Sequence, residues 1–165
     1  MQNHFEILGF APSYSLDNVA LRAAYVKAQQ LAHPDRQIGK TDAERQKAAL
    51  QSAAANDALR VLEDDYLRAV HLLEIKDIFI NGDHATTKPS GMLLMEVMEW
   101  GEEAEENASQ SMLAEFQIKR NELIEKLEEE FGAPYYEKAA QNAIRLRYID
   151  KTLELIAQNM KAIAS

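Results

Sequence analysis

The chain has 165 residues, of which 47% are hydrophobic and 27% are charged, and its formal net charge is -9. This length allows one or two globular domains, and the acidic excess argues against nucleic acid and anionic membranes, because both are bound by clustered lysine and arginine. The chain has no cysteine, which excludes a disulfide framework, a thiolate nucleophile and a cysteine-ligated metal or iron–sulfur site held by this chain alone.

The N-terminal segment contains a short apolar element around Phe5 and Leu8 and then a long predicted helix. Residues 1–10 lack a basic start followed by an apolar run, and the chain has no uninterrupted run of about 18 apolar residues, so we expect a cytoplasmic protein. Ser15 or Asp17 can cap the helix. One helical face carries Leu21, Tyr25, Ala28 and Ala32.

A proline ends this helix. Pro34 fixes its own φ and disfavours the α conformation at His33, so the helix is expected to end near His33 and to leave a turn. Thr41 and Glu44 have the spacing of a capping box, which predicts a second long helix that continues past Leu62. Its periodic apolar positions are Leu50, Ala54, Ala58, Val61 and Leu62. Two antiparallel helices joined by a polar loop are therefore predicted.

Turn formers are concentrated in residues 81–91, between two periodic stretches, and predict a domain boundary there. Three further helices are expected at about Met92–Asn107, Ser111–Phe131 and Tyr135–Ala164. The last has a heptad-like stripe of the kind that packs in a helical bundle. The stripe consists of Leu146, Ile149, Leu153, Ile156, Met160 and Ile163.

A His-Pro-Asp turn at residues 33–35 has almost no specificity by itself and can be a simple helix-terminating turn. Here it follows Phe5-Glu6-Ile7-Leu8-Gly9 and precedes Ala58-Leu59-Arg60-Val61-Leu62, and this order resembles a J-domain over residues 3–70. The resemblance implies that the turn contacts the ATP-bound form of a 70-kDa heat-shock-class chaperone and stimulates its ATP hydrolysis. It also implies a set of chaperone-binding residues: His33, Pro34, Asp35, Arg22, Lys27 and Arg36. J-domains usually carry more basic residues on the helix before the turn, so few charged contacts are expected.

The predicted helix at 92–107 has two apolar faces. At about 100° per residue, Leu93, Val97, Trp100 and Ala104 share one face, which suffices as a core stripe. The opposite side carries apolar residues that run into acidic ones: Leu94, Met95, Met98, Glu99, Glu102 and Glu106. Methionine recurs at adaptable binding surfaces. Burial of this second face by a bundle that surrounds the helix is the alternative.

The order of a J-domain, a linker and an acidic three-helix domain resembles the HscB family of iron–sulfur co-chaperones. Leu94-Met95-Glu96-x-Met98-Glu99-x-x-Glu102 resembles the scaffold-binding helix of that family, and 146–151 resembles a signature on its last helix. The resemblance implies that the six residues of the second face, together with Tyr148, bind an iron–sulfur scaffold protein. The family more often has leucine at the position of Met98 and phenylalanine at the position of Tyr148. Tyr148 lies about 100° from the Ile149 stripe and can be exposed or pack at the bundle edge.

Catalysis and metal binding are not indicated. His4, His33, His71 and His84 share no ligand spacing, and neither a nucleophile elbow nor a phosphate-binding glycine loop occurs. We expect a protein that is not an enzyme and binds no metal or cofactor itself, with any cluster held by the scaffold.

The sequence thus predicts an all-α protein with an L-shaped two-domain arrangement. Residues 1–80 form a J-domain with an antiparallel helical hairpin and short flanking helices, residues 81–91 a linker, and residues 92–165 a three-helix client-binding bundle. The predicted function is a co-chaperone that delivers an iron–sulfur scaffold to its chaperone. Two alternatives stay open: a J-domain co-chaperone for another client, and an acidic helical adaptor without a chaperone partner.

Overall fold

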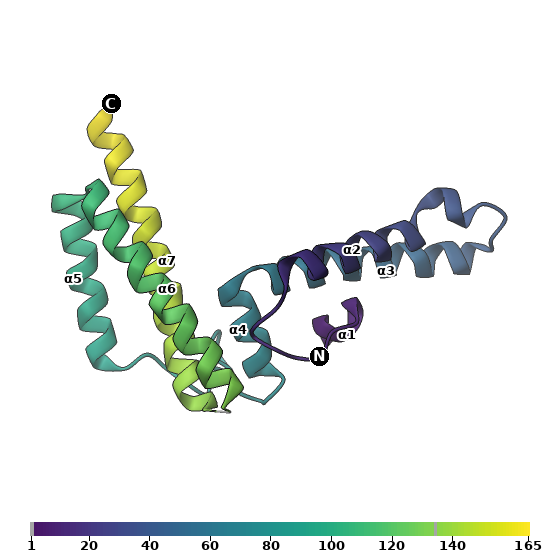
Figure 1. Ribbon diagram of the computed structural model, residues 1–165, viewed down its shortest axis with the longest axis horizontal. Coiled ribbons are helices and arrows are strands. Elements are labelled where there is room, and N and C mark those ends of the chain that lie inside the picture. Colours follow the sequence, from purple (N-terminus) through teal and green to yellow (C-terminus); the bar gives the residue numbers. More distant parts are fainter. Residues whose placement is uncertain (1, 134) are drawn as a thin grey trace. The chain divides into compact units, whose positions relative to one another are not determined.

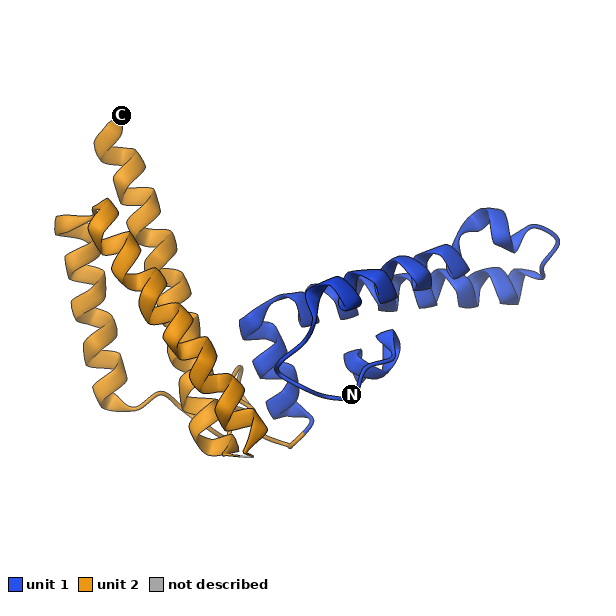
Figure 2. Ribbon diagram, in the orientation of Figure 1, with its two compact units in different colours: residues 1–75 blue, residues 76–165 orange. Residues whose placement is uncertain are grey.

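The computed structural model describes residues 2–133 and 135–165, and every regular element within these residues is a helix. The chain divides into two compact units, residues 1–75 and residues 76–165 (Figure 2). The predicted all-α fold is confirmed for the residues that the structure describes.

The first unit is built on a helical hairpin. Its elements are α1 (His4–Leu8), α2 (Asn18–Ala32), a 3-10 turn (Pro34–Gln37), α3 (Asp42–Glu63) and α4 (Asp65–Glu74). The hairpin consists of α2 and α3, which run antiparallel side by side (Figure 1). Asp17 caps α2, and Thr41 and Glu44 form the predicted capping box of α3, with the Glu44 amide 3.2 Å from Thr41 Oγ1. The predicted starts of both helices are therefore confirmed.

The contacts between α2 and α3 differ between the two ends of the hairpin. Near α1 and α4 its interior is apolar, and Phe5, Leu21 and Leu62 are fully buried. Toward the turn the two helices meet through side-chain amides, because Gln29 donates to the Ser52 carbonyl at 3.0 Å and to Asn56 Oδ1 at 2.9 Å. Leu50, predicted on the apolar stripe of α3, is 65% exposed, whereas Ala48, still nearer the turn, is 6% exposed. The two residues differ by about 200° around the helix, so Leu50 lies on the side away from the buried face.

Arg68 joins three parts of the first unit. It is 7% exposed, and its guanidinium donates to the Tyr14 carbonyl at 2.7 Å, to the Leu62 carbonyl at 2.7 Å and to Asp65 Oδ1 at 2.8 Å. A buried cation is tolerated only when its donors are satisfied. Arg68 therefore fixes the loop before α2, the end of α3 and the start of α4 relative to one another.

The second unit is a three-helix bundle of α5 (Gly91–Asn107), α6 (Gln110–Gly132) and α7 (Tyr136–Ala164). The central helix is α7, which packs against both α5 and α6 (Figure 1). The side-chain oxygens of Ser90 and Ser109 cap α5 and α6. The observed bounds agree with the predicted ones to within one residue.

The apolar stripe of α7 is buried at Leu146, Ile149 and Ile156, as predicted. The prediction is wrong for Ile163, which is 71% exposed. Asn159 is level with Ala104, to whose carbonyl it donates at 2.8 Å, and α5 ends at Asn107. Because α7 runs past the end of α5, Ile163 has no neighbouring helix to pack against on that side.

Residues 76–90 belong to the second unit and are bonded to α7. Ile80 is 9% exposed, Arg147 donates to Asn81 Oδ1 at 3.0 Å, and Gln141 donates to the Lys88 carbonyl at 3.0 Å. The segment that contains the predicted linker is thus attached to the surface of the bundle.

The first unit also contains a histidine that must stay neutral. His71 is 3% exposed, its Nε2 accepts the backbone amide of His4 at 3.0 Å, and its ring stacks on Phe5. Burial, assisted by the neighbouring His4, lowers the pKa of His71 to about 4. Protonation would remove the hydrogen-bond acceptor and place a charge in the core.

This histidine predicts an acid-sensitive first unit. Because the folded-state pKa of His71 lies below the ordinary value of 6.5, the unfolded chain binds more protons between these two pH values. The stabilisation is present above pH 6.5 and is lost toward pH 4, a change on the order of 2–3 kcal/mol in the free energy of unfolding. Chemical denaturation at pH 7 and pH 4.5 should show a smaller pH dependence for His71→Gln than for wild type. The exposed His84 is the control, and equal slopes for His71→Gln and His84→Gln would contradict the prediction.

Candidate functional site

The His-Pro-Asp turn is exposed at the tip of the hairpin. Pro34 is the first residue of the 3-10 turn, and the Asp35 side chain is 86% exposed. The Asp35 backbone amide donates to His33 Nδ1 at 3.2 Å, and the Arg36 amide donates to the His33 carbonyl at 2.9 Å. The imidazole, itself 59% exposed, therefore caps the turn, and the exposed carboxylate of Asp35 has one oxygen 3.6 Å from His33 Nδ1.

Gln37 is the buried residue of this turn. The residue is only 6% exposed, and its side-chain Nε2 donates to the Leu31 carbonyl at 3.1 Å. Gln37 is not among the residues that the sequence predicted for the chaperone contact. The available signal was the proline, because a helix stopped by Pro34 leaves carbonyls of its last turn without amide partners, and a polar side chain soon after the proline can satisfy one.

The three basic residues expected to assist the turn are spread out. Arg22, Lys27 and Arg36 are all exposed, and only Arg36 is adjacent to the turn. Arg22 lies about 16 Å before His33 at the helical rise of 1.5 Å per residue. It forms an ion pair with Glu63 of α3, so its charge is partly neutralised within the unit.

The second face of α5 is exposed. Leu94 is 42%, Met95 66% and Met98 67% exposed, whereas Leu93 on the opposite side is 2% exposed. The bundle therefore does not bury this face, which was the alternative. The acidic residues that continue it are also exposed: Glu99, Glu102 and Glu106. We call these six residues the α5 patch, and Met92, 76% exposed, extends its apolar end.

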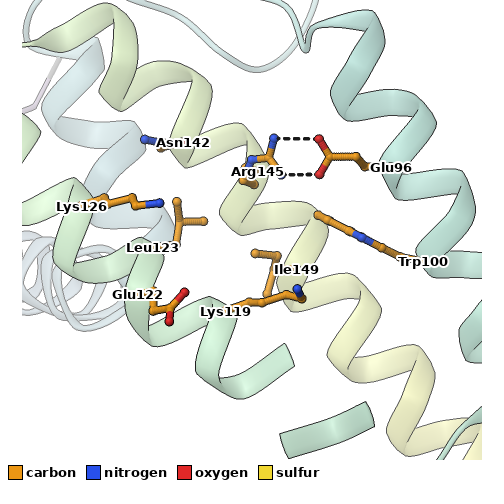
Figure 3. A pocket seen from close by; sticks show the side chains of 9 residues that line it. All are labelled: Glu96, Trp100, Lys119, Glu122, Leu123, Lys126, Asn142, Arg145 and Ile149. Carbon is orange, nitrogen blue, oxygen red and sulfur yellow. Dashed lines mark hydrogen bonds and ion pairs between the residues drawn. The ribbon is translucent and has the colours of Figure 1, made fainter. Parts of the chain in front are cut away.

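Polar contacts from α7 hold α5 in place. The central one is the ion pair of Arg145 and Glu96, in which Nη1 and Nη2 of Arg145 donate to the two carboxylate oxygens at 2.7 and 3.2 Å (Figure 3). The other two are the bond of Gln141 to Lys88 and the bond of Asn159 to Ala104. The bond to Lys88 holds the segment just before α5, and the other two hold α5 itself near its middle and its end.

Between α5 and α6 lies a groove of about 420 Å³ whose walls include Trp100, Lys119 and Lys126 (Figure 3). Trp100 meets Phe116 of α6 edge to face, with ring centroids 5.4 Å apart. Arg145 lies 6.0 Å from the indole centroid. The side of α5 opposite the α5 patch is therefore engaged by both neighbouring helices.

Tyr148 lies on α7 and is half-buried. It follows Arg145 by three residues, so helical geometry places it on the side of α7 that faces α5. Lys151 Nζ lies 5.9 Å from the centroid of its ring. The tyrosine is thus partly accessible beside α5. This lies between the two predicted possibilities, full exposure and packing at the bundle edge.

No group of three or more histidine, aspartate or glutamate side chains within residues 2–133 and 135–165 is arranged to hold a metal ion. His33 and His71, which lie in the same unit, serve as a turn cap and a core residue. Among the described residues, no helix is long and apolar enough to cross a membrane.

Comparison with known proteins identifies the family. The model of the HSCB C-terminal oligomerisation domain matches residues 90–157. The chain is 31% identical over 169 residues to the co-chaperone protein HscB homolog of Vibrio vulnificus, covering 96% of this chain and 98% of that protein. The chain belongs to the HscB co-chaperone family. It is also 29% identical over 160 residues to the HscB homolog of Shewanella loihica, covering 90% of this chain and 92% of that protein.

Solved HscB structures have the same fold. Chaperone HscB from Vibrio cholerae superposes with a TM-score of 0.83 at 25% identity, covering 98% of this chain and 99% of that one. Human co-chaperone protein HscB superposes with a TM-score of 0.83 at 24% identity, covering 100% of this chain and 84% of that one. HscB structures consist of an N-terminal J-domain and a C-terminal helical domain, and this chain shares that fold.

The ion pair beneath α5 predicts a pH-dependent loss of stability in Glu96→Gln. The hydrogen bonds from Arg145 lower the pKa of Glu96, so the pair stabilises the folded unit above pH 4.5, and this contribution is lost as the pH falls through the lowered pKa. Because both side chains are partly exposed, the loss at pH 7 should be about 0.5–1 kcal/mol. Denaturation followed by the fluorescence of Trp100, the single tryptophan, measures it. Glu122→Gln, in the same groove, is the control, and a Glu96→Gln deficit that persists unchanged at pH 3 would refute the ion-pair origin.

Proposed function

We propose that this HscB-family protein stimulates ATP hydrolysis by a 70-kDa heat-shock-class chaperone and delivers an iron–sulfur cluster scaffold protein to it. The similarity to HscB co-chaperones along nearly the whole chain carries this proposal. The protein acts as a cytoplasmic binding protein rather than as an enzyme, and the cluster is held by the scaffold.

The first unit contributes the contact with the chaperone. Asp35 presents a carboxylate on a turn that Pro34 and the His33 imidazole already order, so little conformational entropy is lost when it binds. A carboxylate in this position can pair with an arginine of the ATP-bound chaperone and shift its conformational equilibrium toward hydrolysis. Arg36, beside the turn, supplies a positive charge for an acidic group on the same partner, and Lys27 and Arg22 lie further back along α2.

The second unit contributes the contact with the scaffold. The apolar end of the α5 patch offers Leu94, Met95 and Met98, which gain free energy when a partner removes them from water. The unbranched methionines can adapt to an irregular partner surface. Glu99, Glu102 and Glu106 border this end and favour a partner with basic residues around an apolar centre, with Tyr148 contributing from α7.

Because both contacts are on one chain, the scaffold is brought close to the chaperone. A scaffold bound to the second unit is tethered near a chaperone bound to the first unit, and its effective concentration there exceeds its concentration in solution. Delivery therefore requires only a modest direct affinity of the chaperone for the scaffold.

Asp35→Asn tests the chaperone contact. The substitution removes the charge but keeps the shape of the side chain, so we expect stimulation of the chaperone ATPase to fall by more than tenfold while the circular dichroism spectrum and scaffold binding stay unchanged. The same exchange at the exposed Asp42 is the control. Full stimulation by folded Asp35→Asn would remove the turn from the proposed mechanism.

The double variant Leu94→Ala, Met98→Ala tests the scaffold contact. Loss of two apolar side chains from the α5 patch should weaken scaffold binding by more than about tenfold, which corresponds to about 1.4 kcal/mol. Calorimetric titration with the iron–sulfur scaffold of the same organism measures this. Ile118→Ala is the matched control, since Ile118 is 59% exposed on α6, outside the α5 patch.

The titration also separates the alternatives. If wild type binds no scaffold yet stimulates the chaperone, the client is a different protein. If it does neither and sediments as a concentration-dependent oligomer, the chain is a self-associating adaptor. Equal affinities of the double variant and wild type would place the scaffold on another surface.

A further inference from the structure

We propose that Gln37 is the positioning residue of the His-Pro-Asp turn: its side-chain amide replaces the backbone hydrogen bond that the turn removes from the end of α2, and so holds Asp35 in the orientation that the chaperone binds. This inference rests on the proposed chaperone function, and it assigns a role to a residue that touches neither partner.

At the turn, the Asp35 amide and the Leu31 carbonyl each have a partner other than the one they would have in a continuous helix. In a continuing α-helix, the Leu31 carbonyl would accept the amide of the residue four positions later, which is Asp35. Here the Asp35 amide donates instead to His33 Nδ1 at 3.2 Å. In place of that amide, Gln37 Nε2 donates a hydrogen bond to the Leu31 carbonyl at 3.1 Å. The side chain of Gln37 therefore completes the end of α2 while the Asp35 amide is used by His33.

Burial makes this replacement consequential. Gln37 is 6% exposed, whereas its neighbours Asp35 and Arg36 are exposed. The bond from Gln37 to the Leu31 carbonyl is part-buried, so a carbonyl that loses this donor is not fully compensated by water, and this costs free energy. Without the Gln37 amide, the Leu31 carbonyl competes with His33 for the Asp35 amide. The turn then exchanges between the presented conformation and others.

The proposal predicts a particular kinetic pattern. When only a fraction of the co-chaperone presents Asp35 correctly, the apparent dissociation constant rises by the inverse of that fraction, but saturating co-chaperone still selects the competent form. Loss of the Gln37 amide should therefore raise the concentration needed for half-maximal ATPase stimulation and leave the maximal stimulation unchanged. Loss of the Asp35 carboxylate should instead abolish the maximum.

Gln37→Met in the full-length protein is the test, since methionine has a similar length and shape but no donor. ATPase rates of the 70-kDa chaperone are measured over a range of co-chaperone concentrations. We expect the half-saturation concentration to rise about fivefold with an unchanged maximum. Gln46→Met, the same exchange at an exposed position of α3, should match wild type.

A measurement on the wild type keeps the proposal testable if Gln37→Met does not fold. The side-chain amide protons of Gln37 should exchange with solvent at least tenfold more slowly than those of Gln46 in NMR spectra, because they are buried and bonded. Exchange at equal rates would overturn the proposal.

The outcomes distinguish this inference from the function on which it rests. No stimulation by wild type would reject the chaperone function itself. Stimulation by wild type that folded Gln37→Met reproduces at the same half-saturation concentration would reject only the role of Gln37. A fall in the maximum with an unchanged half-saturation concentration would also reject it, because that pattern belongs to a contact residue.

Discussion

The helix break at Pro34 is the constraint on which the first unit depends. Pro34 has no amide hydrogen and biases His33 away from the α conformation, so the chain cannot continue as one helix from Asn18 to Glu63. It folds back, and the packing of α2 against α3 buries Leu21 and Leu62. The break that creates this core also places the exposed carboxylate of Asp35 at the end of the hairpin. Fold and candidate chaperone contact thus have the same origin in one residue.

Different kinds of contact stabilise the two ends of this hairpin. The end near α1 and α4 has an apolar core and the guanidinium of Arg68, whose removal would take a hydrogen-bond donor from the carbonyls of Tyr14 and Leu62. The end near the turn is joined by amide and hydroxyl contacts such as Ser52 to Gln29 at 2.6 Å and Tyr25 to Asn56 at 2.9 Å. Hydrogen bonds of this kind contribute little net free energy but require particular geometry. The distal half therefore obtains its order from directional contacts, while the rest of the unit supplies the free energy of folding.

Local signals in the sequence predicted most of the helices. Thr41 and Glu44 fixed the start of α3, Pro34 fixed the end of α2, and the helical period separated Leu94 and Met98 from the core face of α5. Contacts between distant residues were not predictable in this way. Arg68 meets Tyr14 and Glu96 meets Arg145 across separations of 54 and 49 residues, and only the folded backbone brings these pairs together. Ile163 shows a different limit, because a period tells which side of a helix is apolar but not where the neighbouring helix ends.

The polar contacts of α7 with α5 and with the segment just before it also determine how the bundle responds to a mechanical load. They lie just before the start of α5, near its middle and near its end, on the side away from the α5 patch. A force applied to the patch of a helix held at one point would act as a lever and tilt it. Because it is held at several points along its length, α5 instead shares a pull on the α5 patch among these contacts as tension. No single contact carries the whole load, so α5 resists tilting away from α7 when a bound client is pulled.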